Sequence, residues 1–145
     1  VIKSNFFNPE LTLQKGNFTK TKPSKLDIIN IKKGIKVLYR LNAHNHIQGL
    51  VIKDNNVIIK ETSKGTKKML QSINKNNAKG GILIKFPKKK QDLRADLPAV
   101  GLDTLKDCKI SNLKGIVLKS NQNIFIDKKK CISFANINKI FINVI

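Results

Sequence analysis

The stretch Gly49-Leu50-Val51-Ile52-Lys53-Asp54-Asn55-Asn56-Val57-Ile58-Ile59-Lys60-Glu61 decides the fold class. Two short apolar runs flank Asn55-Asn56, and asparagine tolerates the positive φ that a two-residue hairpin turn requires. The stretch therefore predicts a β-hairpin. Because the strands of a hairpin are antiparallel, the sheet that contains it cannot be wholly parallel.

Helical and extended patterns alternate on both sides of this hairpin. Before it, Ser24 can cap a helix that reaches about Leu41, and Gly34 weakens that helix locally. After it, we expect a short helix behind Gly65-Thr66, a strand at 82–86, a helix starting at Asp103 as its cap, paired strands at 116–118 and 124–126, a helix at 128–138 capped by Asp127, and a strand at 141–144. The pattern predicts a mixed α/β fold, a single domain whose mixed sheet includes hairpins and is flanked by helices.

The length of 145 residues suits one domain with a core. Residues 1–23 show no sustained period and are predicted to be a linker, or the cut edge of a missing N-terminal domain, ahead of a domain at 24–145. No segment approaches the roughly 18 apolar residues that a membrane span needs. We therefore expect a soluble protein, or one attached at most to a membrane surface.

The net charge of +20 raises the possibility of nucleic-acid binding. However, 27 of the 29 basic residues are lysine, and only Arg40 and Arg94 carry the guanidinium that suits base and phosphate recognition. Abundant Lys, Asn and Ile together indicate AT-rich codons, so a solvated lysine surface is the preferred interpretation and nucleic acid an unlikely partner. Such a surface could still favour anionic lipid head groups or an anionic substrate.

The two cysteines, Cys108 and Cys131, are too far apart for a zinc knuckle or a redox pair and are predicted to be small buried residues. His44 and His46 flank Asn45 with no third ligand near in sequence. We interpret them as surface or loop histidines.

The chain's acidic residues are concentrated around Gln91-Asp92-Leu93-Arg94-Ala95-Asp96-Leu97-Pro98. Polar and apolar residues alternate here, which indicates an extended segment with one polar face. On a straight strand the carboxylates of Asp92 and Asp96 would stand ~13 Å apart, too far to share one metal ion. A shared metal therefore requires a bend, and an ordinary Asp-Arg-Asp ion-pair ladder remains an equally good interpretation of the spacing.

This motif, followed by Gly101 and Thr104 and preceded by the strand Gly81-Ile-Leu-Ile-Lys85, resembles the C-terminal domain of LpxI-type UDP-2,3-diacylglucosamine pyrophosphatases. Gln48, Glu61 and the Gly65-Thr66 pair with Met69 fit the same family upstream, and 115–135 fits it downstream. The likeness covers about 24–145, and residues 9–22 resemble the family's interdomain linker. The order and spacing of these short motifs are more specific than any one of them.

The resemblance implies a cytoplasmic, Mg²⁺- or Mn²⁺-dependent hydrolase of lipid A biosynthesis that acts on UDP-linked diacylated glucosamine, with possible peripheral contact with the inner membrane. It implies a further N-terminal nucleotide-fold domain. The catalytic residues implied are Asp92, Arg94 and Asp96, with Asp92 and Asp96 as metal ligands. The substrate-binding residues implied are Gln48, Gly65, Thr66, Lys85, Gln91 and Thr104.

The chain departs from the family's pattern at Asn45, where an Asp is usual, and at Lys64 and Lys67, where the family's Glu-Gly-Thr-Asp carries two acids. Two alternatives to an active enzyme follow. One is a degenerate relative that keeps the fold without the chemistry. The other is a non-enzymatic lysine-rich module that binds nucleic acid or an anionic membrane.

Overall fold

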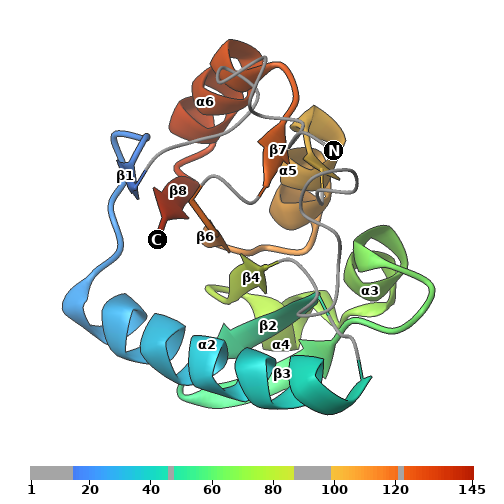
Figure 1. The fold of residues 1–145 in the computed structure, drawn as a ribbon. Coiled ribbons are helices and arrows are strands. Elements are labelled where there is room, and N and C mark those ends of the chain that lie inside the picture. Colours follow the sequence, from blue (N-terminus) through green and yellow to red (C-terminus); the bar gives the residue numbers. More distant parts are fainter. Residues whose placement is uncertain (1–14, 46–47, 87–98, 121–122) are drawn as a thin grey trace, which may run out of the picture.

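The structure is a computed structural model that describes residues 15–45, 48–86, 99–120 and 123–145. Figure 1 shows its elements along the chain. They are, in order, β1 (Gly16–Asn17), α2 (Lys25–Asn45), β2 (Gly49–Lys53), β3 (Asn56–Lys60), α3 (Thr66–Ser72), α4 (Lys75–Ala78), β4 (Ile82–Lys85), β5 (Ala99–Val100), α5 (Leu102–Ile110), β6 (Gly115–Leu118), β7 (Ile124–Phe125), α6 (Lys128–Ile137) and β8 (Phe141–Val144).

Six of these strands form one sheet in the order β1-β8-β6-β4-β2-β3, and β5 pairs with β7 in a separate two-stranded sheet. The three central strands β4, β6 and β8 are parallel, whereas β2 is antiparallel to β4 and β3 is antiparallel to β2. The predicted mixed α/β class is therefore confirmed. The four-residue strands β4 and β6 are buried throughout, as expected where helices cover both faces of a parallel sheet.

The strand directions give the sheet two distinct edges. Strands β3, β4, β6 and β8 all end at the edge where β2 begins, which we call the carboxyl edge, and the opposite edge is the amino edge. In open α/β sheets ligands bind outside the carboxyl ends of the strands. A ligand site is therefore expected at the carboxyl edge.

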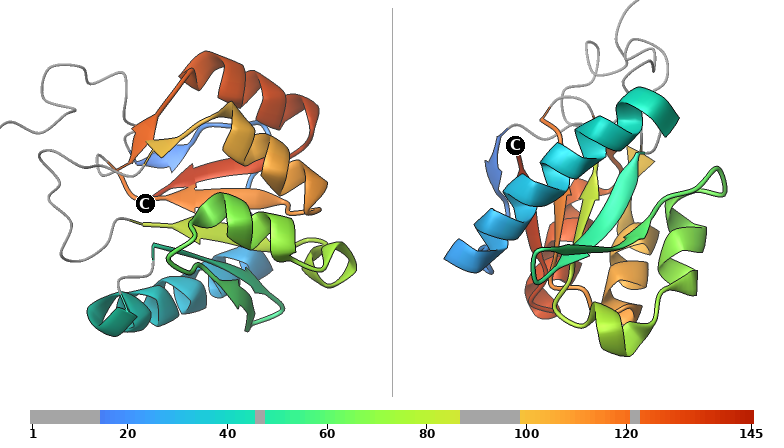
Figure 2. Two further views of the ribbon diagram at one scale, coloured as in Figure 1. Left: turned by 90° about the vertical axis from the view of Figure 1, so that its right-hand side faces the viewer. Right: turned by 90° about the horizontal axis from the view of Figure 1, so that it is seen from below.

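Helices cover both faces of the sheet, with α2 on one face and α3, α5 and α6 on the other (Figure 2). Ile31 and Leu38 of α2 pack into the core on its side. Between them a Cβ at Gly34 would lie only 2.3 Å from Cδ1 of Ile84. The glycine that weakens the helix locally is thus what allows α2 to approach the sheet closely.

The predicted hairpin is confirmed, but its turn is one residue earlier than expected. Lys53 pairs with Asn56, so the turn residues are Asp54 and Asn55, which have φ angles of 48° and 66°. Asp, like Asn, tolerates positive φ, and the register of β2 decides between the two pairs. The pairing shifts between Val51 and Ile52.

Of the three predicted helix caps, the structure confirms Ser24 but not Asp103 or Asp127. The amide of Asp27 donates to Ser24 Oγ over 3.1 Å, which confirms the cap of α2, although this helix continues past Leu41 to Asn45. Asp103 is not the cap of α5, because the helix begins after Gly101 and places Asp103 in its first turn. Asp127 precedes α6 as expected, yet its side chain makes no cap hydrogen bond and its backbone is left-handed.

The strands at 116–118 and 124–126 form as β6 and β7, but they do not pair with each other. Because β6 lies between the parallel strands β4 and β8, β7 pairs with β5 instead. The short elements β1, β5 and α4 were not anticipated. Gly16 of β1, within the predicted linker, pairs with Val144, while the domain boundary at residue 23 stays a prediction.

Candidate functional site

Three polar side chains meet at the carboxyl edge of the sheet. Glu61 directly follows β3, Thr66 is the first residue of α3, and Lys85 is the last residue of β4. All three side chains are polar or charged, yet they are buried, with relative exposures of 5%, 8% and 9%. Buried polar groups of this kind persist only where hydrogen bonds satisfy them.

Two hydrogen bonds join these side chains into what we call the Glu61–Thr66–Lys85 network. The Lys85 ammonium donates to Thr66 Oγ1 over 2.7 Å, and the Thr66 hydroxyl donates to Glu61 Oε2 over 2.8 Å. An ammonium can only donate and a carboxylate can only accept, so the direction of the Thr66 hydroxyl is fixed by its two neighbours. The network thus aligns one buried cation, one hydroxyl and one buried carboxylate.

The electrostatics of Lys85 follow from its burial. Loss of hydration disfavours the ammonium and lowers the pKa of Lys85 below its ordinary value, while the negative charge of Glu61 acts in the opposite direction. Because burial prevails, Lys85 is a cation held where a cation is costly. Groups with such perturbed pKa values are concentrated at functional sites, although structural networks also produce them.

Backbone geometry holds the two ends of the network in place. Gly49, the first residue of β2, pairs with Lys85, and its carbonyl accepts from the Glu61 amide over 2.8 Å. A Cβ on Gly49 would lie 2.8 Å from Glu61 Oε2, so a side chain at this position would displace the carboxylate from where it accepts from Thr66. Gly65, at φ 91°, makes the turn that leads into α3 and delivers Thr66.

Four of the predicted substrate-binding residues lie at this edge: Gln48, Gly65, Thr66 and Lys85. The carbonyl of Gln48 accepts from the Phe86 amide over 2.8 Å, which extends the pairing of β2 with β4. Thr104 lies in the first turn of α5. No hydrogen bond between described residues joins Thr104 to Glu61, Thr66 or Lys85.

The predicted catalytic residues Asp92, Arg94 and Asp96, and the predicted substrate-binding residue Gln91, lie outside the described residues. The described chain reaches Phe86, which directly follows the network's lysine, and resumes at Ala99. Their predicted roles therefore stay predictions.

Glu61 was not among the predicted site residues, yet it is the carboxylate of the network. The available signal was its place directly after a predicted strand, as Lys85 closes another. Residues at the carboxyl ends of strands that run the same way meet at one edge. Without the strand order, nothing in the sequence says that these two ends are near each other.

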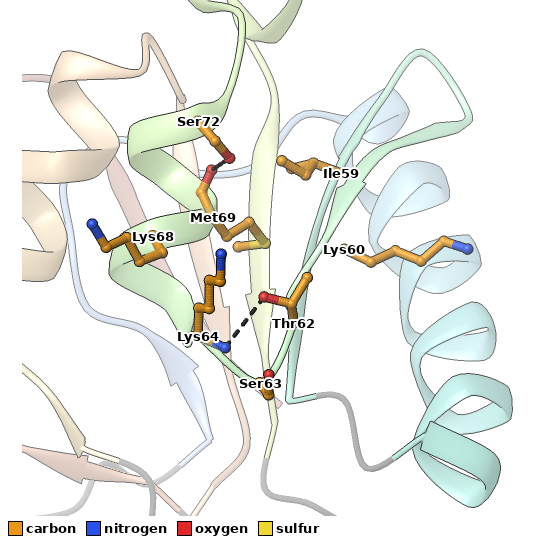
Figure 3. Close-up of a pocket in the computed structure, with 8 residues that line it drawn as sticks. All are labelled: Ile59, Lys60, Thr62, Ser63, Lys64, Lys68, Met69 and Ser72. Carbon is orange, nitrogen blue, oxygen red and sulfur yellow. Dashed lines mark hydrogen bonds between the residues drawn. The ribbon is translucent and has the colours of Figure 1, made fainter.

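A shallow cleft of about 440 Å³ lies beside the network, between β3 and α3. Its lining comprises Ile59, Lys60, Thr62, Ser63, Lys64, Lys68, Met69 and Ser72 (Figure 3). The side chains of Lys60, Lys64 and Lys68 extend in different directions in that view, so they do not converge on one anion. Lys64 and Lys67, the predicted departures from the family's pattern, are both exposed.

The predicted Mg²⁺ or Mn²⁺ would need several carboxylate or other oxygen ligands close together. Within 15–45, 48–86, 99–120 and 123–145, no group of three or more His, Cys, Asp or Glu side chains could hold a metal ion. The Glu61 carboxylate already accepts from Thr66 and is balanced by Lys85. The described part of this edge therefore does not fit a divalent cation by itself.

The cysteines are buried and free, as predicted. Burial raises the pKa of Cys108 to about 12 and that of Cys131 to about 11, which leaves both as unreactive thiols near neutral pH. The side chains of His44 and His46 are outside what the structure describes, so their interpretation stays a prediction.

The comparisons with known proteins point to one family. The model of the LpxI C-terminal domain matches residues 14–143. The UDP-2,3-diacylglucosamine pyrophosphatase LpxI of Caulobacter vibrioides is 27% identical over an alignment of 135 residues; the match covers 88% of this chain and 48% of that protein. The chain thus spans about half the length of the curated relative it matches. With nine-tenths of its residues inside the family match, the chain belongs to the LpxI C-terminal domain family.

Proposed function

We propose that this chain provides the hydrolytic site of an enzyme that cleaves the pyrophosphate of UDP-2,3-diacylglucosamine in lipid A biosynthesis. Water would attack the α-phosphorus, and the products would be UMP and 2,3-diacylglucosamine 1-phosphate. Family membership and the activity in the name of the Caulobacter relative support this reaction. A second, N-terminal nucleotide-fold domain would complete the enzyme in the cytoplasm.

The observation that carries the proposal is the buried ammonium of Lys85 at the carboxyl edge. The ammonium has three N–H donors, and one of them makes the hydrogen bond to Thr66. A pyrophosphate oxygen could accept from another, and a preorganised cation in a site of low polarity stabilises the charge that develops on the phosphoryl group. Thr66 and Glu61 would keep the ammonium aimed at that position.

The remaining roles follow the family resemblance. Asp92 would orient the attacking water or hold a metal, Arg94 would grip a phosphate, and Asp96 would support the metal or the local structure. Mg²⁺ or Mn²⁺, when bound through Asp92 and Asp96, would supply charge neutralisation. The other substrate contacts proposed are from Gln48, Gly65, Gln91 and Thr104.

The test is release of UMP from UDP-2,3-diacylglucosamine by the protein purified at its full coding length. Wild type should release UMP, and Asp92→Asn should reduce the rate about a hundredfold or more. The matched control is Asp54→Asn, which changes an exposed hairpin-turn acid and should leave the rate unchanged. Normal turnover by Asp92→Asn would remove Asp92 from the mechanism.

Chelation tests the proposed metal separately. EDTA should abolish UMP release, and added Mg²⁺ or Mn²⁺ should restore it. Full activity in EDTA would contradict the metal requirement while leaving the hydrolytic assignment intact. Absence of UMP release by wild type under every condition would favour a degenerate relative, an outcome to which Lys64 and Lys67 already lend weight.

A further inference from the structure

The outward face of α2 carries an unusual combination of side chains. Its inward residues pack on the sheet, and Leu26, Ile28, Ile29 and Tyr39 are exposed by 72%, 43%, 55% and 50%. Seven large hydrophobic residues are exposed in the described part of the chain, and these four belong to one helix. Genome composition explains many lysines and isoleucines, but it does not explain why the exposed apolar residues gather on α2.

The charge on the same face has one sign. The exposed basic residues of α2 are Lys25, Lys32, Lys33, Lys36 and Arg40. The helix contains one acid, Asp27, which is only 4% exposed and pairs with Lys114. By contrast, α5 exposes Asp103 together with Lys106 and Lys109. The described residues of α2 therefore place no acid on its outward face, which interleaves cationic and apolar side chains.

This combination fits an anionic lipid surface better than a nucleic acid. Lysines attract anionic head groups, while leucine and isoleucine between them gain by entering the boundary with the acyl chains. A phosphodiester backbone would take the lysines but offers nothing to exposed aliphatic side chains. No helix of the described residues is long and apolar enough to cross a membrane.

The position of α2 agrees with such a role. The helix lies across one outer face of the molecule (Figure 2). Near its end, Tyr39 packs against Phe86, and Lys119 donates to the Tyr39 hydroxyl over 3.2 Å. Since Phe86 and Lys119 directly follow β4 and β6, the face reaches the carboxyl edge where the Glu61–Thr66–Lys85 network lies. We propose that the outward face of α2 docks on an anionic phospholipid bilayer, beside the carboxyl edge.

The proposal does not depend on the proposed hydrolysis and is tested by vesicle flotation. The protein at its full coding length should float with phosphatidylcholine vesicles that contain phosphatidylglycerol, and much less with phosphatidylcholine alone. Replacing Lys32, Lys33 and Lys36 by Gln should weaken binding on the order of a hundredfold, because each lysine near an anionic surface contributes about fivefold. Leu26→Gln with Ile29→Gln should weaken it roughly tenfold.

Two matched control variants distinguish binding through the outward face of α2 from nonspecific attraction by the protein's overall positive charge. Changing Lys109, Lys129 and Lys130 to Gln removes three exposed lysines from the opposite side of the sheet and should have little effect. Ile137→Gln removes an isoleucine that is 80% exposed on α6 and should have none. Equal loss in both lysine triples would overturn the proposal.

Two further outcomes would overturn it. If neither the lysine variant nor the Leu26 and Ile29 variant of α2 changed vesicle binding, the outward face of α2 would not be the surface that contacts the bilayer. A loss of binding with the lysine variant but not with the Leu26 and Ile29 variant, together with release from vesicles by RNA, would indicate a general polyanion surface.

Discussion

The two edges of the sheet each pair a buried acid with a lysine, but only the carboxyl edge buries the lysine as well. At the amino edge, Asp27 is nearly inaccessible while the side chain of its partner Lys114 is 44% exposed. At the carboxyl edge, Lys85 itself is 9% exposed and reaches its acid, Glu61, only through Thr66. A half-hydrated lysine loses little solvation, whereas a buried one loses much of it.

The pKa values reflect this difference. Burial alone would raise the pKa of Asp27, but hydrogen bonds from Lys114 and Ser24 outweigh it and hold the pKa below its ordinary value. For Lys85, burial outweighs the attraction of Glu61 and lowers the pKa. The amino edge is therefore arranged so that folding favours its charge, and the carboxyl edge maintains a charge that folding disfavours. Such a cost is expected where function requires the charge.

Lys85→Met should produce the largest effect on activity. Loss of the ammonium should reduce UMP release by the full-length protein about a hundredfold or more, as removal of one preorganised donor commonly does. Because Met also leaves the buried Glu61 carboxylate without its cation, turnover is compared per folded molecule, with circular dichroism as the check on folding. Lys114→Met is the matched control and should change the turnover of folded protein by less than about twofold. Comparable turnover in both lysine variants would remove the functional distinction between the edges.

Asp27→Ala should have the opposite profile. The change removes the ion pair with Lys114 and the acceptor of the Ser24 amide, so we expect the free energy of unfolding to fall by about 2 kcal/mol. Turnover per folded molecule should remain normal. Urea unfolding followed by circular dichroism measures the first effect and UMP release the second. Asp27→Asn should be milder, since its amide oxygen still accepts from Ser24; equal losses in Asn and Ala would argue against the cap contribution.

Thr66→Val tests the hydroxyl that joins Glu61 to Lys85. Valine keeps the shape but removes both hydrogen bonds, and kcat/KM should fall roughly tenfold through a less well-positioned ammonium. Thr66→Ser retains the hydroxyl and should restore most of the rate. If serine were as impaired as valine, the methyl group's packing and not the hydroxyl would be the important feature.

The parts of the fold that could be predicted from the sequence are those set by interactions between residues close together in the chain. The hairpin of β2 and β3, the start of α2 at Ser24, and the strands β4 and β8 follow from local periodicity and turn residues. The one-residue error at Asp54-Asn55 arises because Asp and Asn both tolerate positive φ, and only pairing across the sheet selects between them. Elements of two to four residues, such as β5 and α4, are too short to show a period.

The site divides in the same way. Thr66 and Lys85 were predicted through resemblance, while the joining of Glu61 to them depends on the strand order β6-β4-β2-β3. That order brings residues 61, 66 and 85 to one edge, and no local pattern encodes it. The lysine-rich composition concealed the burial of Lys85, because no local pattern shows which of the 27 lysines is buried.

The smallest expected effect is on the pH dependence of stability, which should differ between the two edges. Each group can change the free energy of unfolding by at most about 1.4 kcal/mol per pH unit. The folded pKa of Asp27 lies below 3.8, so its contribution is complete above that pH and is lost as the pH falls through the folded value. The folded pKa of Lys85 lies below 10.5. Between that value and pH 10.5 the unfolded chain binds more protons, so stability should rise with pH there.

Urea unfolding across both pH ranges measures these slopes. Asp27→Asn should flatten only the acid limb, and Lys85→Met only the alkaline limb, relative to wild type. Lys114→Met serves as a control on the alkaline side, because removal of a half-exposed lysine should leave the Lys85 slope in place. An alkaline limb that survives Lys85→Met would mean that the carboxyl edge does not hold a disfavoured cation, and the contrast between the two edges would lose its physical basis.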